Sequence, residues 1–435
     1  MREEYLHFLW RMKRLNFNKL QLVNGSKLPV IVKDVGWYNL DAGPDFFNGT
    51  AIIDGIQWSG NIEIHIKSSD WYAHKHHLDR TYDNVILHVV YEHDREVMVN
   101  GKPIPTIELK NLINKRHLQY YSSLVDSSNY IPCHKEVMQH HLALLQQIDI
   151  SFINRIERKG LALFEGFEEQ IISKNELFYV AVLKAVGGRA NRLPMQQLSK
   201  YLSYKIIEKE KWEATRLDAL LFGVAGFLKE ECDDHYFKEL HGIWKFLKNK
   251  YQLVEMNPKA WKFNGIRPYS FPTLLLVQLS AFFQQIEIGR IQFHDSDFII
   301  EKINRLHSKK IHPYWRTHFL FGRETKERNL HFSKLFQNNL LINGVIPFLV
   351  ALKHLKNDYI FADVAVELAE KLSPERNKVM NYWKAIGFQP KNVLESQGLL
   401  ELNNEFCNFK KCLSCKVGST ILENEKINSE NSILF

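Results

Sequence analysis

The sequence predicts an α+β or α/β protein in which a small N-terminal mixed sheet with flanking helices precedes a large all-α domain. Short apolar runs separated by turn signals fill about the first 110 residues, which is typical of strands. After Asn111, apolar positions recur every three to four residues, which is typical of helices. The chain has 435 residues, 45% of them hydrophobic. It is therefore long enough for two or three domains of about 100–200 residues each.

The first domain opens with a helix and continues with strands. Residues 1–17 place charged and apolar positions at helical spacing, which predicts an amphipathic helix and no cleaved signal. Short strands should follow, closed by turn signals such as Asn24-Gly25 and Asp54-Gly55. The run NVILHVVYEH, residues 84–93, is long and β-branched enough for a central strand, and residues 95–109 are typical of a hairpin. We therefore expect a mostly antiparallel sheet.

The rest of the chain is predicted to be helical, with a cysteine-bearing end. The clearest helical segments are ELFYVAVLKAVGG, LDALLFGVAGFLKEE, TLLLVQLSAFFQQI and DVAVELAEKL. We expect an α/β domain at residues 1–110, a helical domain at 111–400 and a C-terminal segment at 401–435. This last segment should pack back on the first domain and finish in a polar tail.

Composition and spacing exclude several classes of protein. Lys and Arg outnumber Asp and Glu by 57 to 49, and the resulting net charge of +8 permits nucleic-acid binding without requiring it. The most apolar stretches are shorter than the roughly 20 residues of a membrane-spanning helix, so we expect a cytoplasmic protein without a membrane partner. Gly187-Gly188-Arg189 ends a helix and lacks the Walker spacing, which excludes an ATPase of that type.

Three ionisable residues share one face of the predicted strand in GNIEIHIK. Glu63, His65 and Lys67 alternate there with isoleucines. Asp45, in AGPDF, precedes them at the start of the previous strand, so Asp45 and Glu63 could hold one Mg²⁺ or Mn²⁺ ion whose water attacks a phosphodiester. His65 or Lys67 would assist that water and stabilise the phosphoryl group. The alternative is the solvated face of a two-layer sheet.

The histidines that follow this strand offer a second metal site. Six of the 19 histidines lie between residues 65 and 93. His74 and His76, with Asp79 and either His65 or His88, are suitable ligands for Zn²⁺ or another borderline metal. The alternative is that these loop histidines are merely polar or orient a phosphate or carboxylate group. Both metal sites would use the same pocket.

A third candidate site lies among the cysteines. Cys407, Cys412 and Cys415 form a C-x4-C-x2-C run among lysines near the C-terminus. A closed zinc or iron–sulfur site needs a fourth thiolate. Cys133 is the best candidate, because Cys232 is isolated on an expected helix. Such a site would tie the end of the chain to the first domain, and the alternative is four reduced cysteines without a metal.

Two of these patterns resemble those of known nucleases. Pro44-Asp45 followed by Glu63-Ile64-His65 is similar to the PD-(D/E)xK motif, with a histidine in place of the usual lysine. The expected order of helix, strands, helical turn and strand is also similar to the restriction-endonuclease-like fold of those enzymes. Certain nucleases related to RecB carry a comparable set of one remote and three clustered cysteines, which binds a 4Fe–4S cluster.

Nearly the whole chain, residues 4–418, resembles a bacterial family found mainly among Bacteroidetes, the domain-of-unknown-function family numbered twenty-eight fifty-one. The resemblance rests on the motifs AGPDF, GNIEIHIKSSDWYAHKHHLDRTYDNVILHVV, IPC, GIRPYSFP, LLINGVIPFL and CNFKKCLSCKVG. It implies a family and no particular chemistry.

Together these patterns predict a metal-dependent nuclease or a nuclease-like protein that processes nucleic acid, with DNA or RNA as its partner. One alternative is an inactive nucleic-acid or protein-binding module on the same scaffold, because loss of the lysine often accompanies loss of catalysis. The other is a histidine-ligated metalloenzyme acting on a small molecule. Loop residues at Arg267-Pro268-Tyr269 and Trp315-Arg316 could contact phosphates or stack on bases, or else pack between helices.

Overall fold

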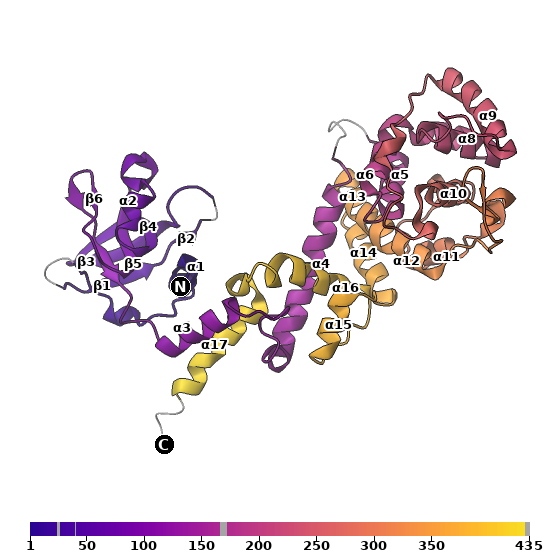
Figure 1. The fold of residues 1–435 in the computed structure, drawn as a ribbon. Coiled ribbons are helices and arrows are strands. Elements are labelled where there is room, and N and C mark those ends of the chain that lie inside the picture. Colours follow the sequence, from indigo (N-terminus) through magenta and orange to yellow (C-terminus); the bar gives the residue numbers. More distant parts are fainter. Residues whose placement is uncertain (24–26, 40, 166–171, 431–435) are drawn as a thin grey trace. The chain divides into compact units, whose positions relative to one another are not determined.

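The structure, a computed structural model, has the predicted class: a mixed sheet with helices comes first and a large helical region follows (Figure 1). It describes residues 1–23, 27–39, 41–165 and 172–430. The predicted turn at Asn24-Gly25 and the last five residues lie outside the described residues.

The chain divides into two compact units. Unit 1 comprises residues 1–147, 385–387 and 402–435, and unit 2 comprises residues 148–384 and 388–401. The cysteine-bearing C-terminal segment thus belongs to the same unit as the sheet, and so do the residues from 111 to 147.

Unit 1 is built on a six-stranded sheet with the order β1-β3-β4-β5-β8, in which β2 pairs with β3. Strands β1, β3 and β4 are antiparallel, whereas β4, β5 and β8 are parallel. The prediction of a mostly antiparallel sheet was therefore wrong for the second half, because residues 68–84 form a helical crossover that returns the chain to start β5 beside Asn61, in the middle of β4. The strands are β1 Val30–Asp34, β2 Trp37–Tyr38, β3 Phe46–Ile53, β4 Ile56–Lys67, β5 Val85–Glu92 and β8 Thr106–Glu108.

Strand β4 is buried on both faces from Gly60 to His65. Ile62 and Ile64 are 0% exposed on one face, and Glu63 and His65 are 4% and 1% exposed on the other. Helix α1, Glu3–Arg11, packs against β4. The crossover after β4 consists of α2 Asp70–Ala73, η2 His76–Leu78 and η3 Arg80–Tyr82. Burial of Glu63 and His65 excludes the alternative in which this face of the strand is solvated.

The remaining elements of unit 1 join the sheet to the C-terminal segment. Helix α17, Lys416–Glu430, packs against α3, Lys115–Val125, and against η4, Val137–His140. The segment predicted as a frayed tail is therefore helical as far as Glu430. The other elements of this unit are η1 Phe17–Lys19, β6 Met98–Val99, β7 Lys102–Pro103, η11 Leu402–Cys407 and η12 Cys412–Ser414.

Unit 2 is an all-helical core with one short hairpin. Helices α5, α10 and α13 are apolar on nearly all sides and pack in its centre, as expected for helices without a polar face. The helices are α4 His141–Leu161, which begins in unit 1, α5 Lys174–Val186, α6 Arg192–Tyr201, α7 Tyr204–Glu210, α8 Ala214–Val224, α9 His235–Tyr251, α10 Pro272–Phe283, α11 Ser296–Asn304, α12 Lys334–Leu340, α13 Ile346–Lys356, α14 Ile360–Lys371, α15 Lys378–Ala385, whose last residue belongs to unit 1, and α16 Val393–Glu401. The short elements are η5 Pro258–Ala260, η6 Pro268–Ser270, η7 Ile288–Arg290, η8 Ser308–Lys310, η9 Pro313–Arg316, β9 His318–Leu320 and β10 Arg323–Glu324.

A π-helical turn, η10 Leu341–Val345, joins α12 to α13 into one helical run over Lys334–Lys356. By length and composition this run could cross a membrane, since its most apolar stretch has a mean hydropathy of 1.5. However, 72% of that stretch is buried inside the structure, which is the burial of a core helix.

Candidate metal centre

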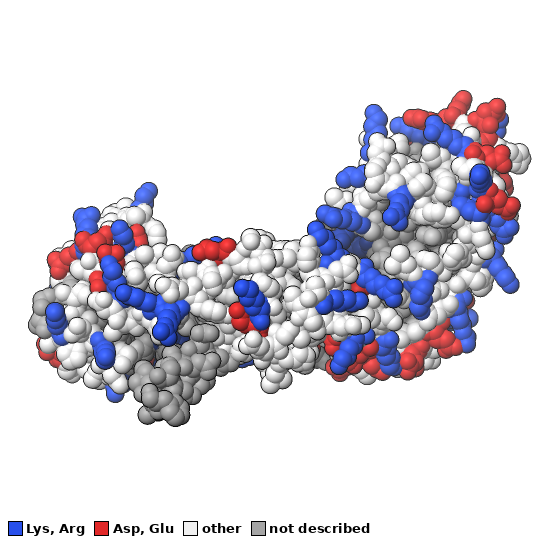
Figure 2. All heavy atoms as spheres, turned by 60° about the horizontal axis from the view of Figure 1, so that its bottom comes forward, with Lys and Arg blue, Asp and Glu red and all other residues white. Residues whose placement is uncertain are grey.

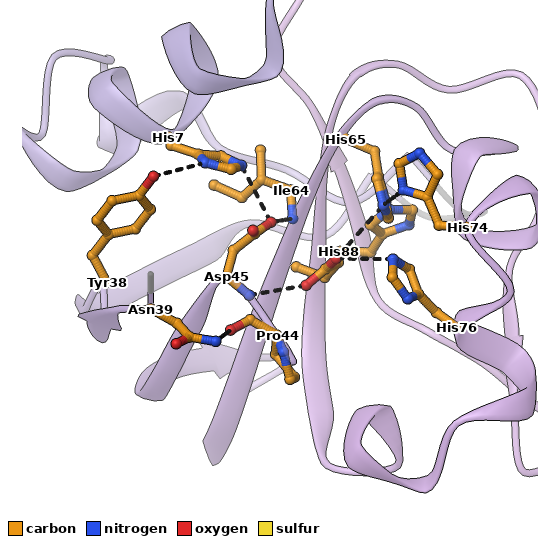
Figure 3. A network of polar contacts seen from close by, with 11 residues as sticks. His7, Tyr38, Asn39, Pro44, Asp45, Ile64, His65, His74, His76 and His88 are labelled. Carbon is orange, nitrogen blue, oxygen red and sulfur yellow. Dashed lines mark hydrogen bonds and ion pairs between the residues drawn. The ribbon is translucent and has the colours of Figure 1, made fainter. Parts of the chain in front are cut away.

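The candidate site starts from two buried polar side chains on β4. Glu63 and His65 project from the same face of the strand because successive side chains alternate. Strands β3 and β5 lie on either side, so water reaches neither residue from the flanks. The crossover helix and turns after β4 close over this face (Figure 3). A carboxylate and an imidazole in such a place need partners, because burying them unpaired is costly.

The crossover supplies two further histidines through an unusual turn. Lys75 adopts the left-handed conformation, with φ of 65°, between His74 and His76. This backbone conformation is uncommon for a residue with a side chain, and it turns the chain so that both flanking histidines face His65 (Figure 3). The ring of His76 also stacks on Tyr82, with centroids 3.9 Å apart.

Four potential ligand atoms meet at this point. His65 Nε2 lies 3.2 Å from His74 Nδ1 and 3.5 Å from Glu63 Oε1. His76 Nε2 lies 3.2 Å from the same glutamate oxygen. The ligand atoms of the three histidines all lie within 4.8 Å of one another. We call this set, Glu63, His65, His74 and His76, the four-ligand cluster.

The protonation of the buried rings suits metal binding. Burial, together with the neighbouring histidine rings, lowers the pKa of His65 to about 2. Burial also lowers the pKa of His76 below its ordinary value. Both rings are therefore neutral near pH 7, and neutral imidazole is the form that coordinates metals. His65 and His76 thus offer nitrogen lone pairs and no competing positive charge.

His88 supports His65 from behind. It lies on β5 opposite Glu63 in the strand register, and its Nε2 is 2.8 Å from His65 Nδ1. Burial lowers the pKa of this fully buried ring to about 3. A hydrogen bond to the second nitrogen of a ligating histidine fixes the ring orientation and the tautomer. His88 is thus a positioning residue for His65.

Asp45 adjoins the four-ligand cluster through its main chain. Its backbone N–H donates to Glu63 Oε2 at 3.0 Å, which leaves Oε1 facing the histidines. Its own Oδ2 accepts from the backbone N–H of Ile64 at 2.9 Å and lies 3.2 Å from His7 Nε2 (Figure 3). Burial, and then the charge of Asp45, raise the pKa of Glu63 above its ordinary value. The two carboxylates are therefore joined by a backbone hydrogen bond, with different side chains around each.

Helix α1 contributes acidic and basic groups next to Asp45. The carboxylate of Asp45 outweighs burial and raises the pKa of His7, which favours a charged pair. Burial and the charge of Asp45 raise the pKa of Glu3 to about 7. A cluster of partly buried carboxyl groups that repel one another is typical of a site that gains from a cation.

An open pocket of about 500 Å³ borders the cluster. It is lined by His74, His76, Lys75, Tyr82 and Asp79, and by the loop that leads to Asp45. Asp79 also accepts hydrogen bonds from the backbone and hydroxyl of Thr81 and so begins the turn η3. The pocket gives a ligand access to the histidine side of the cluster.

Lys67 lies apart from this pocket. It is exposed at the end of β4, opposite Glu92, and its backbone N–H bonds to Asp70. The structure brings together most of the residues named from the sequence: Glu63, His65, His74 and His76, with His88 against His65 and Asp45 against Glu63.

A second cavity, of about 1220 Å³, lies in unit 2. Its lining carries Arg189, Arg267, Lys334 and Arg376, with Glu375 as an acidic residue. Figure 2 shows Lys and Arg side chains gathered around a hollow in the helical part of the molecule.

Tyr269, 60% exposed, is an aromatic side chain of this cavity lining, and it follows Arg267 in the loop that the sequence singled out. Trp315, the other aromatic residue singled out from the sequence, is fully buried in the core. It therefore packs between helices and offers no surface for a base.

Comparison with known proteins gives a family. A sequence model of the family described as protein of unknown function (DUF2851) matches residues 3–378. This chain belongs to the DUF2851 family. No curated protein and no solved structure matches it. The DUF2851 match includes the four-ligand cluster, Cys133 and the residues that line the second cavity, whereas Cys407, Cys412 and Cys415 lie beyond its end.

Sequence reasoning missed His7 and Glu3 of this DUF2851 protein. Both lie on the first helix, more than thirty residues before Asp45. Their signal was present but weak: a histidine and a glutamate stand at i and i+4 positions of an otherwise apolar helix face. Nothing in the spacing alone related that face to the later strands.

Proposed function

We propose that this DUF2851 protein is a metal-dependent phosphodiesterase that acts on nucleic acid, with a divalent transition-metal ion held by Glu63, His65, His74 and His76. The observation that carries the proposal is the convergence of three histidine ring nitrogens within 4.8 Å of one another. Glu63 Oε1 lies beside two of these rings, 3.5 Å from His65 Nε2 and 3.2 Å from His76 Nε2, and histidine and carboxylate are both common ligands of zinc.

The ligand set favours a transition metal over Mg²⁺. Imidazole nitrogen is a preferred ligand of Zn²⁺ and its first-row neighbours, whereas Mg²⁺ prefers oxygen and retains water. Bound there, the ion would lower the pKa of a water molecule and so supply a hydroxide nucleophile at neutral pH. Catalytic zinc sites keep one coordination position open to water or substrate. The pocket beside His74 and His76 gives water and substrate access on that side.

The surrounding residues have separate roles in this proposal. His88 orients His65 through its other ring nitrogen, and the backbone N–H of Asp45 orients Glu63. Lys75 lines the same pocket as the two loop histidines. An ammonium there would neutralise a phosphate oxygen as negative charge develops.

The charge of the second cavity supports a nucleic-acid substrate. Four cationic side chains and an exposed tyrosine line one hollow of unit 2. Cations bind the phosphate backbone and aromatic rings stack on bases, so this combination is typical of single-stranded nucleic-acid sites. A small phosphodiester would need no second cavity of this kind.

The test combines metal analysis with cleavage. The full chain is assayed on single- and double-stranded DNA and RNA with Zn²⁺, Mn²⁺ or Mg²⁺, beside the double variant H74A/H76A. H77A is the matched control, because His77 is adjacent and exposed but outside the cluster. We expect one transition-metal ion per chain at the cluster and cleavage that H74A/H76A lose and H77A keeps. Cleavage equal in all three proteins would contradict the proposal.

One observation favours a second function, nucleic-acid binding without catalysis. Lys67 is exposed and away from the pocket, and both ring nitrogens of His65 already have close partners. No lysine then assists at Glu63 as in the PD-(D/E)xK pattern. Salt-dependent binding of single strands, with no cleavage by the metal-loaded protein, would favour this function over hydrolysis.

A further inference from the structure

Four of the five cysteines gather in unit 1, away from the residues of the four-ligand cluster. Cys133 lies in the loop before η4, and Cys407, Cys412 and Cys415 lie between η11 and α17. Each side chain is buried, with 7 to 8% of its surface exposed. All four are free thiols and form no disulfide. Four buried thiols from two distant segments call for a structural explanation.

The two segments are held together by specific contacts. Lys410 Nζ donates to the carbonyl of Ser127 at 2.7 Å, and the backbone N–H of Lys416 donates to Gln147 Oε1 at 2.7 Å. Helix α17 packs against both η4 and η12, the elements that carry or adjoin Cys133 and Cys412. The cysteines are thus brought together by the packing of the whole unit and not by one flexible loop.

The backbone around the three C-terminal cysteines is tightly shaped. A Cβ on Gly418 would lie only 2.2 Å from the carbonyl oxygen of Cys412, so the first turn of α17 packs directly on the η12 loop. The backbone N–H of Cys415 donates to the carbonyl of Cys412 at 3.3 Å, so the segment that carries these two cysteines is a tight turn.

The four thiols lie in a place poor in water, since every one of these side chains is buried. A thiolate buried without a counter-charge is costly. Only a bound cation would make thiolates favourable there.

The spacing of the sulfurs excludes one common occupant. A single Zn²⁺ with four Zn–S bonds of about 2.3 Å holds its sulfurs about 3.8 Å apart. Within the part of the chain that the structure describes, the group of three or more ligand atoms within 4.8 Å is the histidine set, and no three cysteine sulfurs are that close. An iron–sulfur cube, with one thiolate on each of its four irons, keeps its thiolates farther apart.

We propose that Cys133, Cys407, Cys412 and Cys415 bind one 4Fe–4S cluster. Each thiol loses its proton to solvent and forms one iron–sulfur bond, so the preformed cluster gains four thiolate ligands without any change in its oxidation state. Nearby cations, Lys410 and Arg2 beside Cys412, offset the negative charge of the four thiolates. The cluster fastens the C-terminal segment to the loop at Cys133 and is independent of the function proposed for the four-ligand cluster.

The test is elemental and spectroscopic. The full chain, purified without oxygen, is analysed for iron, acid-labile sulfide and zinc, and for the visible absorption of an iron–sulfur cluster. We expect four irons and four sulfides per chain. C412S should lose the cluster, while C232S keeps it, because Cys232 is a lone thiol in unit 2. One zinc per chain that C412S loses, with no iron, would overturn the proposal.

A folding readout keeps the variant informative. Circular dichroism and the elution volume of C412S are compared with those of the unaltered chain, and C133S, on the other segment, is analysed in parallel. Loss of iron in both folded variants supports the proposal. Iron retained in either folded variant, or an unaltered chain that takes up no iron when supplied anaerobically with iron and sulfide, would contradict it.

Discussion

Replacing Glu63 by glutamine should stabilise the metal-free protein and abolish its stabilisation by metal. The Glu63 carboxyl is 4% exposed, and its pKa is raised above the ordinary value of 4.5 by burial and by Asp45. A carboxyl whose pKa is raised on folding does not affect stability below pH 4.5, where it is protonated in both the folded and the unfolded state. As the pH rises from 4.5 toward the folded pKa, it lowers the free energy of unfolding. At pH 7, with 1.36 kcal/mol per pH unit, this loss of stability is at most about 3 kcal/mol.

Glutamine removes that cost and retains the geometry. Its amide oxygen accepts from the backbone N–H of Asp45, and its NH₂ group donates to the ring nitrogens that face Glu63 Oε1. We expect E63Q to raise the metal-free melting temperature by about 2–6 °C, which corresponds to about 1–3 kcal/mol in a domain of this size. Stability gained by neutralising a functional residue is a common trade-off.

Metal should make the unaltered chain more stable than E63Q, which reverses the order of their melting temperatures. At a free metal concentration 100 times its Kd, binding adds about 2.7 kcal/mol to the stability of the unaltered chain. E63Q has lost the one charged ligand of the four-ligand cluster, so its melting temperature should barely respond. The assay is thermal unfolding at pH 7 with increasing Zn²⁺ or Mn²⁺, with E92Q, an exposed glutamate on β5, as the matched control. A metal-induced shift in E63Q as large as that of the unaltered chain would refute the reasoning.

The other predictions concern three further parts of the chain. Gly418→Ala should destabilise unit 1 by about 1–3 kcal/mol, because the added Cβ would meet backbone atoms, and it should also lower the iron content. Gly242→Ala is the control, since a Cβ on this residue of α9 would stand in open space. In the same thermal assay it should leave stability unchanged or raise it by up to about 1 kcal/mol. Arg267→Ala should weaken binding of single-stranded DNA. The plot of log affinity against log salt concentration should become shallower by the contribution of about one phosphate contact. An unchanged slope would count against a phosphate contact of Arg267. The Asp45 carboxylate outweighs burial and raises the pKa of His7 in the folded protein. The His7–Asp45 pair therefore stabilises the folded state fully below the unfolded pKa of 6.5, and this stabilisation is lost as the pH rises through the folded pKa. His7→Gln should remove it, and urea unfolding of both proteins from about pH 5 to 9 measures the difference.

The sequence placed the candidate site in unit 1 but misassigned part of the sheet. Alternation in GNIEIHIK was enough to place Glu63 and His65 on one face, because the side-chain period of a strand is two. The direction of β5 was not available from such patterns. The direction of β5 depends on whether residues 68–84 cross over the sheet or form a hairpin. The burial of Trp71 and Tyr82 favours the crossover.

The arrangement of the candidate ligands could not be predicted from the spacing of residues in the sequence. The spacing of His74 and His76 does not give the direction of the two rings, which depends on the left-handed conformation of Lys75 between them. That conformation is unfavourable by itself and persists only because the surrounding packing fixes it. Sequence composition carries no signal for such a turn at a lysine.

The sequence by itself determined the class of the fold, the shared strand face of Glu63 and His65, and the four cysteines as a set, because these depend on local periodicity and on residue chemistry. Only the tertiary structure decided that His7 reaches Asp45, that Lys67 points away from the pocket, and that four cations from separate segments line one cavity. Such proximities between distant residues follow from how whole faces are buried together. They are properties of the packed core, which no single segment encodes.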